Sequence, residues 1–196
     1  MLGAAAVAAP LSKDDPDLSR EALLADPATP VGGARDGDLT IVAFLDYNCP
    51  YCMKSDAALR DFVRADGRVR VVYKDWPILG PVSEDAARLA LSAKYQGKYE
   101  AAHEALMSGA RKSSAEQARR LLAGAGVDMA RLDADLAGHR AEIDATLKRT
   151  EKQADAMQFA GTPVYLIGPL LVAAPLDRKG FEDAAAEARA RSAPTR

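Results

Sequence analysis

Cys49 and Cys52 are the residues whose type and spacing most directly indicate chemistry, and they are the only cysteines of the chain. They flank Pro50 and Tyr51 where an apolar run gives way to a helical pattern. Unpaired N–H groups and the positive end of the helix dipole stabilise an anion at a helix start, which favours a Cys49 thiolate. Cys52 lies on the same helix face, within disulfide reach. The pair predicts a redox-active dithiol in which Cys49 is the exposed attacking thiol and Cys52 the more buried resolving thiol.

Other uses of two cysteines at this spacing are weaker. A structural zinc site needs four ligands, and only His103 and His139 could join the cysteines, at spacings unlike those of zinc motifs. A structural disulfide closing so short a loop would stabilise the fold little. Two core thiols meeting by coincidence, and a dithiol that binds a soft ion such as Cu(I), are the remaining alternatives. We favour redox chemistry and expect neither a metal nor a cofactor.

The elements that must position the dithiol form a strand, a helix and a second strand. Residues 39–45 are a nearly continuous apolar run of strand length, which is typical of a strand inside a covered sheet. A helix is expected over residues 50–66, because Pro50 suits its first position and Gly67 its end. Residues 69–73 are the next apolar run, so the two strands are expected to be parallel neighbours.

Outside this unit, the spacing of apolar residues and the capping residues predict a helical block followed by two strands. Upstream, prolines and glycines at positions 27, 30, 32 and 33 are expected to interrupt regular structure. The other expected elements are helices over residues 18–25, 84–95, 98–107 and 139–160, two shorter helices opened by Ser113 and Ser114 and by Asp128, strands over 164–167 and 170–172, and a final helix over 178–191. The fold class is therefore α/β: a thioredoxin fold over residues 31–80 and 161–196, an inserted α-helical domain over 81–160, and an N-terminal segment over 1–30.

A second motif, Gly161-Thr162-Pro163, opens the first of the late strands. Alone, a proline at this position indicates only the boundary between a helix and a strand. Together with an upstream pair of cysteines, it resembles the cis-proline loop of thioredoxin folds, and the resemblance implies a cis bond between Thr162 and Pro163 that turns the Thr162 backbone toward the dithiol. An extended substrate could then pair with that backbone as an added strand.

The chain resembles the DsbA-like branch of the thioredoxin superfamily, and within it the ScsC and Com1 type. The matching segments are FLDYNCPYC at residues 44–52, YKDWPILG at 73–80, QGKY at 96–99 and GTPVYLIG at 161–168. The resemblance implies a bacterial thiol:disulfide oxidoreductase, periplasmic or otherwise exported, that acts on reduced or misoxidised exported proteins. It also implies a membrane or soluble redox partner that recycles the dithiol. Donation of the Cys49–Cys52 disulfide is the first hypothesis, and a reductase or isomerase of the ScsC type is the alternative.

Two positions depart from the family. Relatives often carry a buried acidic residue six positions before the first cysteine, where this chain has Ala43, so a proton relay to Cys52 is missing or supplied elsewhere. The Pro50-Tyr51 dipeptide also occurs in glutaredoxins, but those lack so long a helical block, and Tyr51 cannot supply a positive charge to the site. Glutathione-dependent isomerases of this scaffold generally lack the cysteine pair.

Composition limits the partners. The 26 basic and 28 acidic residues leave a net charge of −2 with the signs interspersed, which argues against electrostatic capture of nucleic acid or an anionic membrane. We interpret the alanine-rich residues 1–10 as the remnant of an export signal, with a disordered terminus as the alternative. The resemblance implies that isomerases of this family oligomerise through N-terminal extensions, and because only 35 or so residues precede the first clear strand here, we expect a monomer.

Several polar residues are less informative in the sequence. His103 shares a helix face with Tyr99 and Met107, which favours packing or hydrogen bonding over chemistry. His139 is expected to be exposed. Asp46 and Lys74 cannot be placed relative to the dithiol. Three C-terminal arginines are expected to complement a helix C-terminus, namely Arg189, Arg191 and Arg196.

Overall fold

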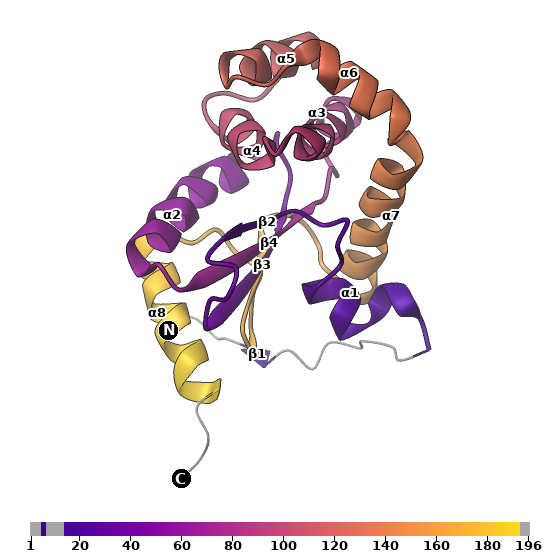
Figure 1. Ribbon diagram of the computed structural model, residues 1–196. Coiled ribbons are helices and arrows are strands. Elements are labelled where there is room, and N and C mark those ends of the chain that lie inside the picture. Colours follow the sequence, from indigo (N-terminus) through magenta and orange to yellow (C-terminus); the bar gives the residue numbers. More distant parts are fainter. Residues whose placement is uncertain (1–4, 7–13, 193–196) are drawn as a thin grey trace.

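A single six-stranded sheet with helices on both faces forms the centre of the molecule (Figure 1). The computed structural model describes residues 5–6 and 14–192. Strand order across the sheet is β1-β6-β5-β3-β4-β2. The strands are β1 Ala5–Ala6, β2 Val31–Gly33, β3 Leu39–Leu45, β4 Val69–Asp75, β5 Val164–Ile167 and β6 Leu170–Val172.

Strand β3 lies in the middle of the sheet and carries the dithiol at its C-terminal end. It pairs in parallel with β4, from Leu39 opposite Val69 to Leu45 opposite Asp75, and antiparallel with β5. Helix α2 Pro50–Asp66 makes the crossover between β3 and β4. The predicted β-α-β unit is therefore confirmed, with β4 running two residues further than expected. Because β3 is covered on both faces, its sequence is apolar at every position except Thr40 rather than alternating.

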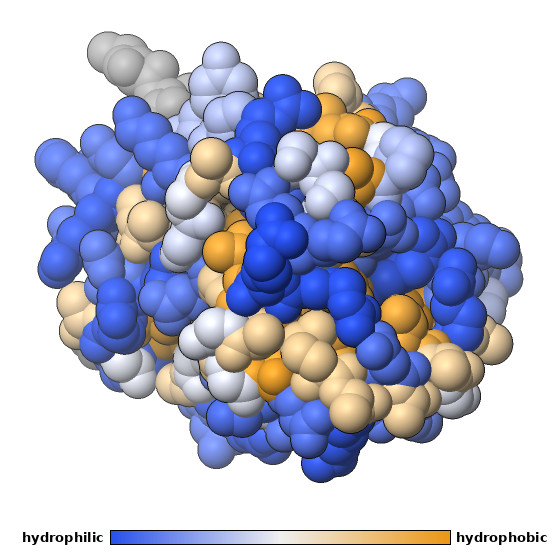
Figure 2. Space-filling model, turned by 90° about the horizontal axis from the view of Figure 1, so that it is seen from above, coloured by the Kyte–Doolittle hydropathy of each residue, from blue (hydrophilic) through white to orange (hydrophobic). Residues whose placement is uncertain are grey.

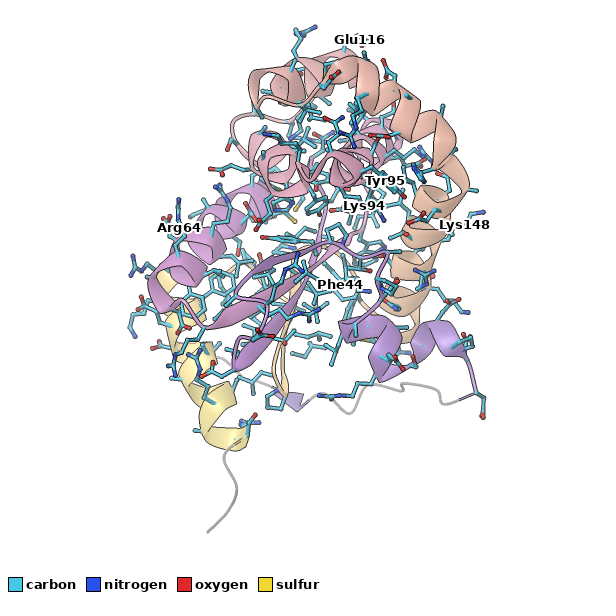
Figure 3. The ribbon with its side chains drawn as sticks, in the orientation of Figure 1. Phe44, Arg64, Lys94, Tyr95, Glu116 and Lys148 are labelled. Atoms are coloured by element: carbon cyan, nitrogen blue, oxygen red, sulfur yellow. The ribbon has the colours of Figure 1, made fainter. Side chains whose placement is uncertain are left out.

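The two faces of the sheet bury two hydrophobic cores. On one face, Ile41 and Leu45 pack with α2 and with α8 Arg178–Ser192, where the rings of Phe62 and Phe181 stack 6.1 Å apart. On the other, Phe44 points from β3 toward α1 Arg20–Leu24 and α7 Arg140–Ala156, while Lys148 lies on the outer side of α7 (Figure 3). Alternate residues of β3 thus serve opposite cores, as the pleat of a strand requires.

Most of the helices between β4 and β5 gather at one end of the sheet, and the last of them, α7, runs from there along the sheet toward α1 (Figure 1). The helices of this segment are α3 Pro81–Ala93, α4 Tyr99–Met107, α5 Ala115–Gly124, α6 Met129–Gly138 and α7, with the 3-10 turn Lys94–Gln96 after α3. Seen from above, over these helices, the surface is mostly hydrophilic, with hydrophobic side chains in patches between the charged ones (Figure 2). The α/β fold with a thioredoxin-like sheet and added helices agrees with the predicted class.

Two expectations about where regular structure begins or ends were wrong. Residues 31–33 form a paired edge strand, because Gly33 at φ 69° approaches the carbonyl of Val69 so closely that a Cβ would lie 2.4 Å from its oxygen. The helix expected over residues 139–160 is α7, which ends at Ala156. Gln158 takes a left-handed conformation, and the Phe159 ring folds back to lie 5.2 Å from that of Phe44. Core packing of one aromatic ring ends the helix there.

The N-terminal expectations are only partly within the described residues. Ala5 and Ala6 pair with Leu171 and Leu170 of β6, and the rest of the interpreted signal remnant lies outside the described residues. The expected helix over residues 18–25 is a 3-10 turn, Pro16–Leu18, followed by α1.

The helix caps predicted from single residues are present. The Ser114 side chain accepts the N–H of Gln117, and Asp128 accepts the N–H groups of Ala130 and Arg131 at 3.0 Å each.

We expect Asp128→Ala to lower the free energy of unfolding by about 1 kcal/mol, because two N–H groups at the start of α6 lose their acceptor. Urea denaturation measures this, with Asp155→Ala, at an exposed position of α7, as the control, expected to change stability by less than about 0.5 kcal/mol. Equal effects of the two variants would contradict the capping role.

Candidate active site

The dithiol sits at the junction of β3 and α2. Cys49 is the N-cap of α2, and its sulfur accepts the Cys52 N–H at 3.4 Å. Both thiols are free in this structure. Cys49 is 5% exposed and Cys52 is 0% exposed, so the expectation of an openly exposed attacker was wrong in degree. The exposed member of the motif is Tyr51, at 65%.

The environments of the two thiols differ strongly. A hydrogen bond from Cys52 lowers the pKa of the Cys49 thiol to about 5, with further help from backbone N–H groups at the helix start, although burial opposes this. Burial raises the pKa of the Cys52 thiol far above its ordinary value. At neutral pH the pair therefore holds one thiolate, on Cys49, and one proton, on Cys52. A low-pKa sulfur is both a reactive nucleophile and a good leaving group in disulfide exchange.

The proline loop lies directly against the dithiol. The Thr162–Pro163 peptide bond is cis, and the Thr162 carbonyl oxygen lies 3.4 Å from the Cys49 sulfur. Beside it, a shallow groove of about 270 Å³ separates Tyr51 from this loop and from residues 173–175. An extended chain lying in this groove could approach both the Cys49 sulfur and the Thr162 backbone.

Three consecutive residues before Cys49 attach the dithiol to the helical segment. The buried Asp46 carboxylate accepts the Asn48 N–H at 2.6 Å, the Leu79 N–H at 3.0 Å and the Ser83 hydroxyl at 2.8 Å. Ser83 belongs to α3. One carboxylate thus fixes the turn that leads into α2, the loop after β4 and the start of α3.

The next two residues make equally specific contacts. Tyr47 places its hydroxyl 3.0 Å from His103 Nδ1 and 3.3 Å from the Tyr99 hydroxyl, both on α4. Asn48 exchanges two hydrogen bonds with the backbone of Lys112, at 2.8 and 3.2 Å. The Lys112 ammonium is buried and donates to the carbonyls of Tyr47 and Leu106, and burial lowers its pKa to about 8.

Position 43, where relatives often carry a buried acidic residue, holds alanine here, and no other residue of β3 supplies a carboxylate. Ala43 is fully buried and lies opposite Tyr73 in the sheet. Buried carboxylates lie elsewhere, at Asp56, one turn after Cys52 on α2, and at Asp75, the last residue of β4. The Asp56 spacing from Cys52 was visible in the sequence. Nothing in the sequence marked Lys112 or Asp75.

The remaining polar residues have structural partners. His103 is buried and bonds Asp56 Oδ1 at 2.8 Å, as its helix face suggested, and Lys74 donates to Ala22 and Thr29, on the other side of the sheet from α2. His139 is only half-exposed, because its ring stacks 3.7 Å from that of Tyr95.

Arg189 and Arg191 lie in the last turn of α8, where they complement the helix C-terminus as expected. Arg189 also pairs with Asp38 and Asp66, and Arg191 pairs with Glu187, while Arg196 lies outside the described residues. Within the described part of the chain, His, Cys, Asp and Glu side chains do not gather in any group of three that could hold a metal ion.

Comparison with known proteins gives a consistent family. Residues 40–178 match the model of the DSBA-like thioredoxin domain. A thioredoxin-like oxidoreductase from Silicibacter pomeroyi superposes with a TM-score of 0.82 and 40% identity, over 90% of this chain and 99% of that one. The catalytic domain of Proteus mirabilis ScsC superposes with a TM-score of 0.77 and 27% identity, over 87% of this chain and 94% of that one.

Curated relatives are much longer. The Na(+)/H(+) antiporter NhaA 1 of Mycolicibacterium vanbaalenii is 30% identical over 152 residues, which cover 75% of this chain and 24% of the antiporter. Across the first relatives of this kind, the chain spans between 21% and 24% of their length. Among the residues that the structure describes here, none of the helices combines the length and apolar character needed to cross a membrane.

Proposed function

Because this chain belongs to the DSBA-like thioredoxin domain family, we propose that it is a thiol:disulfide oxidoreductase that donates its Cys49–Cys52 disulfide to substrate proteins. The observation that carries the proposal is the asymmetry of the two thiols. Cys49 has a pKa of about 5, whereas the pKa of the buried Cys52 is raised far above its ordinary value. A stabilised Cys49 thiolate favours the reduced form of the protein, which makes its disulfide an oxidant.

The reaction then runs in two exchanges. A substrate thiolate attacks the Cys49 sulfur, the bond between Cys49 and Cys52 breaks, and Cys52 leaves as a thiolate that takes up a proton. A second thiolate of the substrate then attacks the substrate sulfur that is bonded to Cys49. The substrate disulfide forms, and Cys49 leaves as the stable thiolate. The substrate is oxidised by two electrons and the dithiol is reduced by two.

Substrate docking beside Tyr51 would use the groove at the proline loop. The Thr162 backbone and Pro163 form one wall, and the exposed Tyr51 ring and Pro50 lie beside the dithiol. Main-chain pairing with Thr162 suits an extended segment of many different sequences. This supports a role on unfolded or partly folded protein substrates.

We place these substrates outside the cytoplasm, as reduced or misoxidised exported proteins of a bacterium, because dithiol oxidants work in oxidising compartments. A membrane or soluble redox partner would reoxidise Cys49 and Cys52 after each turnover. The chain is proposed to act as a monomer.

A second candidate is a reductase or isomerase, favoured by the similarity to the catalytic domain of Proteus mirabilis ScsC. In that role the dithiol is kept reduced, and Cys49 attacks wrong disulfides in the substrate. The two roles share every site residue and differ in the reduction potential of the pair.

The equilibrium reduction potential separates these candidates. We expect a value of about −120 to −150 mV in glutathione buffers, typical of an oxidant, whereas a value of about −220 mV or below would favour the reductase or isomerase. Trp76, the single tryptophan, or thiol alkylation follows the equilibrium. Failure to form a Cys49–Cys52 disulfide would contradict both the oxidant role and the reductase or isomerase role. It would favour a dithiol that binds a soft metal ion.

The same titration has an expected pH dependence. Below pH 5 reduction takes up two protons, so the potential should fall by about 59 mV per pH unit, and above pH 5 it takes up one, so the slope should be about 30 mV. A single slope of about 59 mV up to pH 8 would contradict the low pKa of Cys49.

A further inference from the structure

A second groove begins beside the dithiol, between α2 and the loop after α4. It encloses about 510 Å³ and is lined by residues 50, 53, 54, 57, 60 and 107–111; we call it the basic groove. On α2, the lining residues from Pro50 to Ala57 are spaced three and four apart, so they lie on one face of the helix. Residues 107–111 form the facing wall. Because Pro50 directly follows Cys49, the basic groove starts at the attacking thiol.

The facing wall is fixed relative to Cys49. Lys112 follows this wall in the chain, and Asn48, the residue before Cys49, exchanges two hydrogen bonds with the Lys112 backbone. The Lys112 ammonium also donates to the carbonyl of Leu106, which precedes the wall, so the loop is closed on itself. The wall therefore needs little ordering when a ligand binds, which lowers the cost of binding.

Apolar side chains and unpaired cations share the basic groove. Met53 is half-buried and Met107 is buried, and flexible methionine side chains adapt to ligands of different shape. Lys54 and Arg111 are exposed, and neither forms an ion pair within the part of the chain that the structure describes. Arg60, the remaining charged residue of the lining, is already paired with carboxylates. Among the described residues, the lining thus offers two unpaired positive charges and no negative one.

The basic groove continues the path of a substrate chain past the dithiol. Tyr51 lines the groove at the proline loop, whereas the neighbouring Pro50 lines the basic groove. An extended chain that pairs with Thr162 and crosses Cys49 can therefore enter the basic groove. Lys54 is five residues after Cys49, a helical rise of about 7.5 Å, and an extended chain advances about 3.3 Å per residue. A substrate residue about two to four positions from the reacting cysteine then reaches Lys54.

We propose that the basic groove binds an acidic stretch of the substrate, about two to four residues from the cysteine that bonds to Cys49, and so selects substrates by charge. The proposal rests on the proposed function and names its substrate class: proteins whose reactive cysteine is flanked by Asp or Glu together with apolar residues. Main-chain pairing with Thr162 accepts many sequences, whereas the basic groove distinguishes between them. The net charge of −2 gives the molecule as a whole no attraction for acidic chains, so the selection is local.

The test measures docking separately from turnover. Cys52→Ser holds a substrate as a mixed disulfide on Cys49, so the amount of adduct at equilibrium reports docking whichever way the dithiol works. Two peptides with one cysteine and the same apolar residues compete for Cys49, and they differ only in carrying Glu or Lys at the flanking positions. Mass spectrometry gives the ratio of the two adducts in a mercaptoethanol redox buffer. Dividing by the ratio of the peptides' mixed disulfides with mercaptoethanol removes the effect of the flanking charges on the peptide thiols.

At low salt we expect the Glu peptide to exceed the Lys peptide at least about fivefold on Cys49, and salt at about 1 M should bring the ratio near one. Adding Lys54→Glu/Arg111→Glu reverses both groove charges and should favour the Lys peptide. Arg64→Glu/Lys179→Glu is the matched control, because it changes the net charge equally at two exposed positions outside the groove. It should keep the preference for the Glu peptide.

Equal adduct ratios in the groove variant and in the control would overturn the docking proposal. A dimer of the unaltered protein that sedimentation shows to be lost in Lys54→Glu/Arg111→Glu would assign the groove to a second copy of the chain and would also overturn it. If the Glu peptide is preferred as expected but the unaltered protein does not oxidise a reduced dithiol peptide, the basic groove stands and the proposed function is overturned.

Discussion

Cys49→Ser is expected to abolish disulfide exchange, lowering its rate by at least about a thousandfold, because a serine hydroxyl is not ionised where the Cys49 sulfur is. Cys52→Ser is the informative partner. It keeps the attacking thiolate but lacks the thiol that resolves the mixed disulfide, so it should accumulate covalent adducts with substrate. Turnover of reduced model proteins measures the first effect, and non-reducing gel electrophoresis measures the second.

The low pKa of Cys49 also predicts how the stability of the reduced protein and the rate of attack by Cys49 depend on pH. The pKa of Cys49 falls from its ordinary 9.0 to about 5 on folding, so the unfolded chain binds more protons between these values. The reduced protein therefore gains stability that is fully present above about pH 9 and is lost as the pH falls through 5. The oxidised protein lacks this thiolate and should not show the effect. Attack by the reduced protein on a disulfide should rise with pH to a plateau above about pH 6.

Two results would contradict this assignment. Residual exchange by Cys49→Ser above that of Cys49→Ser/Cys52→Ser would make Cys52 the attacking thiol. A rate that keeps rising to pH 9 would show that the Cys49 environment does not stabilise its thiolate.

Asp46→Ala is expected to lower the free energy of unfolding by about 3–5 kcal/mol, the largest stability effect we predict for a single residue outside the dithiol. Three buried donors lose their acceptor at once: the N–H groups of Asn48 and Leu79 and the hydroxyl of Ser83. Asp46→Asn keeps the shape and one acceptor oxygen, so it should cost less, about 1–2 kcal/mol.

Urea denaturation of the oxidised and reduced forms measures these changes. Asp61→Ala is the matched control, because that carboxylate is 56% exposed and pairs with Arg64 on the same helix, an arrangement worth less than about 1 kcal/mol. A cost for Asp46→Ala no greater than for the control would mean that water replaces the carboxylate at its three donors.

The sequence was sufficient where a feature depends on nearby residues. Pro50 and Gly67 bound α2 because one lacks an N–H and the other adopts a left-handed conformation, and both requirements are local. Asp128 caps α6 for the same reason. The apolar run of β3 predicted a central strand because burial on both faces leaves little room for polar residues. These elements place Cys49 and Cys52, so the dithiol was predicted with its surroundings.

Features that depend on distant residues were not predictable unless a motif marked them, as it did for the proline loop. Lys112 is an ordinary surface residue by type, and only the fold brings its ammonium to the Tyr47 carbonyl, 65 residues away. Asp75 follows Tyr73 and Lys74 in a strand, with nothing local to mark it as buried. The glycines of β2 suggested a break because their use, a close approach to Val69, is a long-range contact.

The attachment of residues 46–48 to the helices limits how far this protein is modular. The side chains of Asp46, Tyr47 and Asn48 form hydrogen bonds with three different parts of the segment between β4 and β5. A graft of the CPYC motif and the proline loop onto a bare thioredoxin core would carry the sulfur atoms without the groups that hold them. Conversely, sequence drift in α3, α4 or the loop at Lys112 can retune the dithiol while its own residues stay unchanged. The helices are thus a place where a redox potential can evolve at a distance from the cysteines.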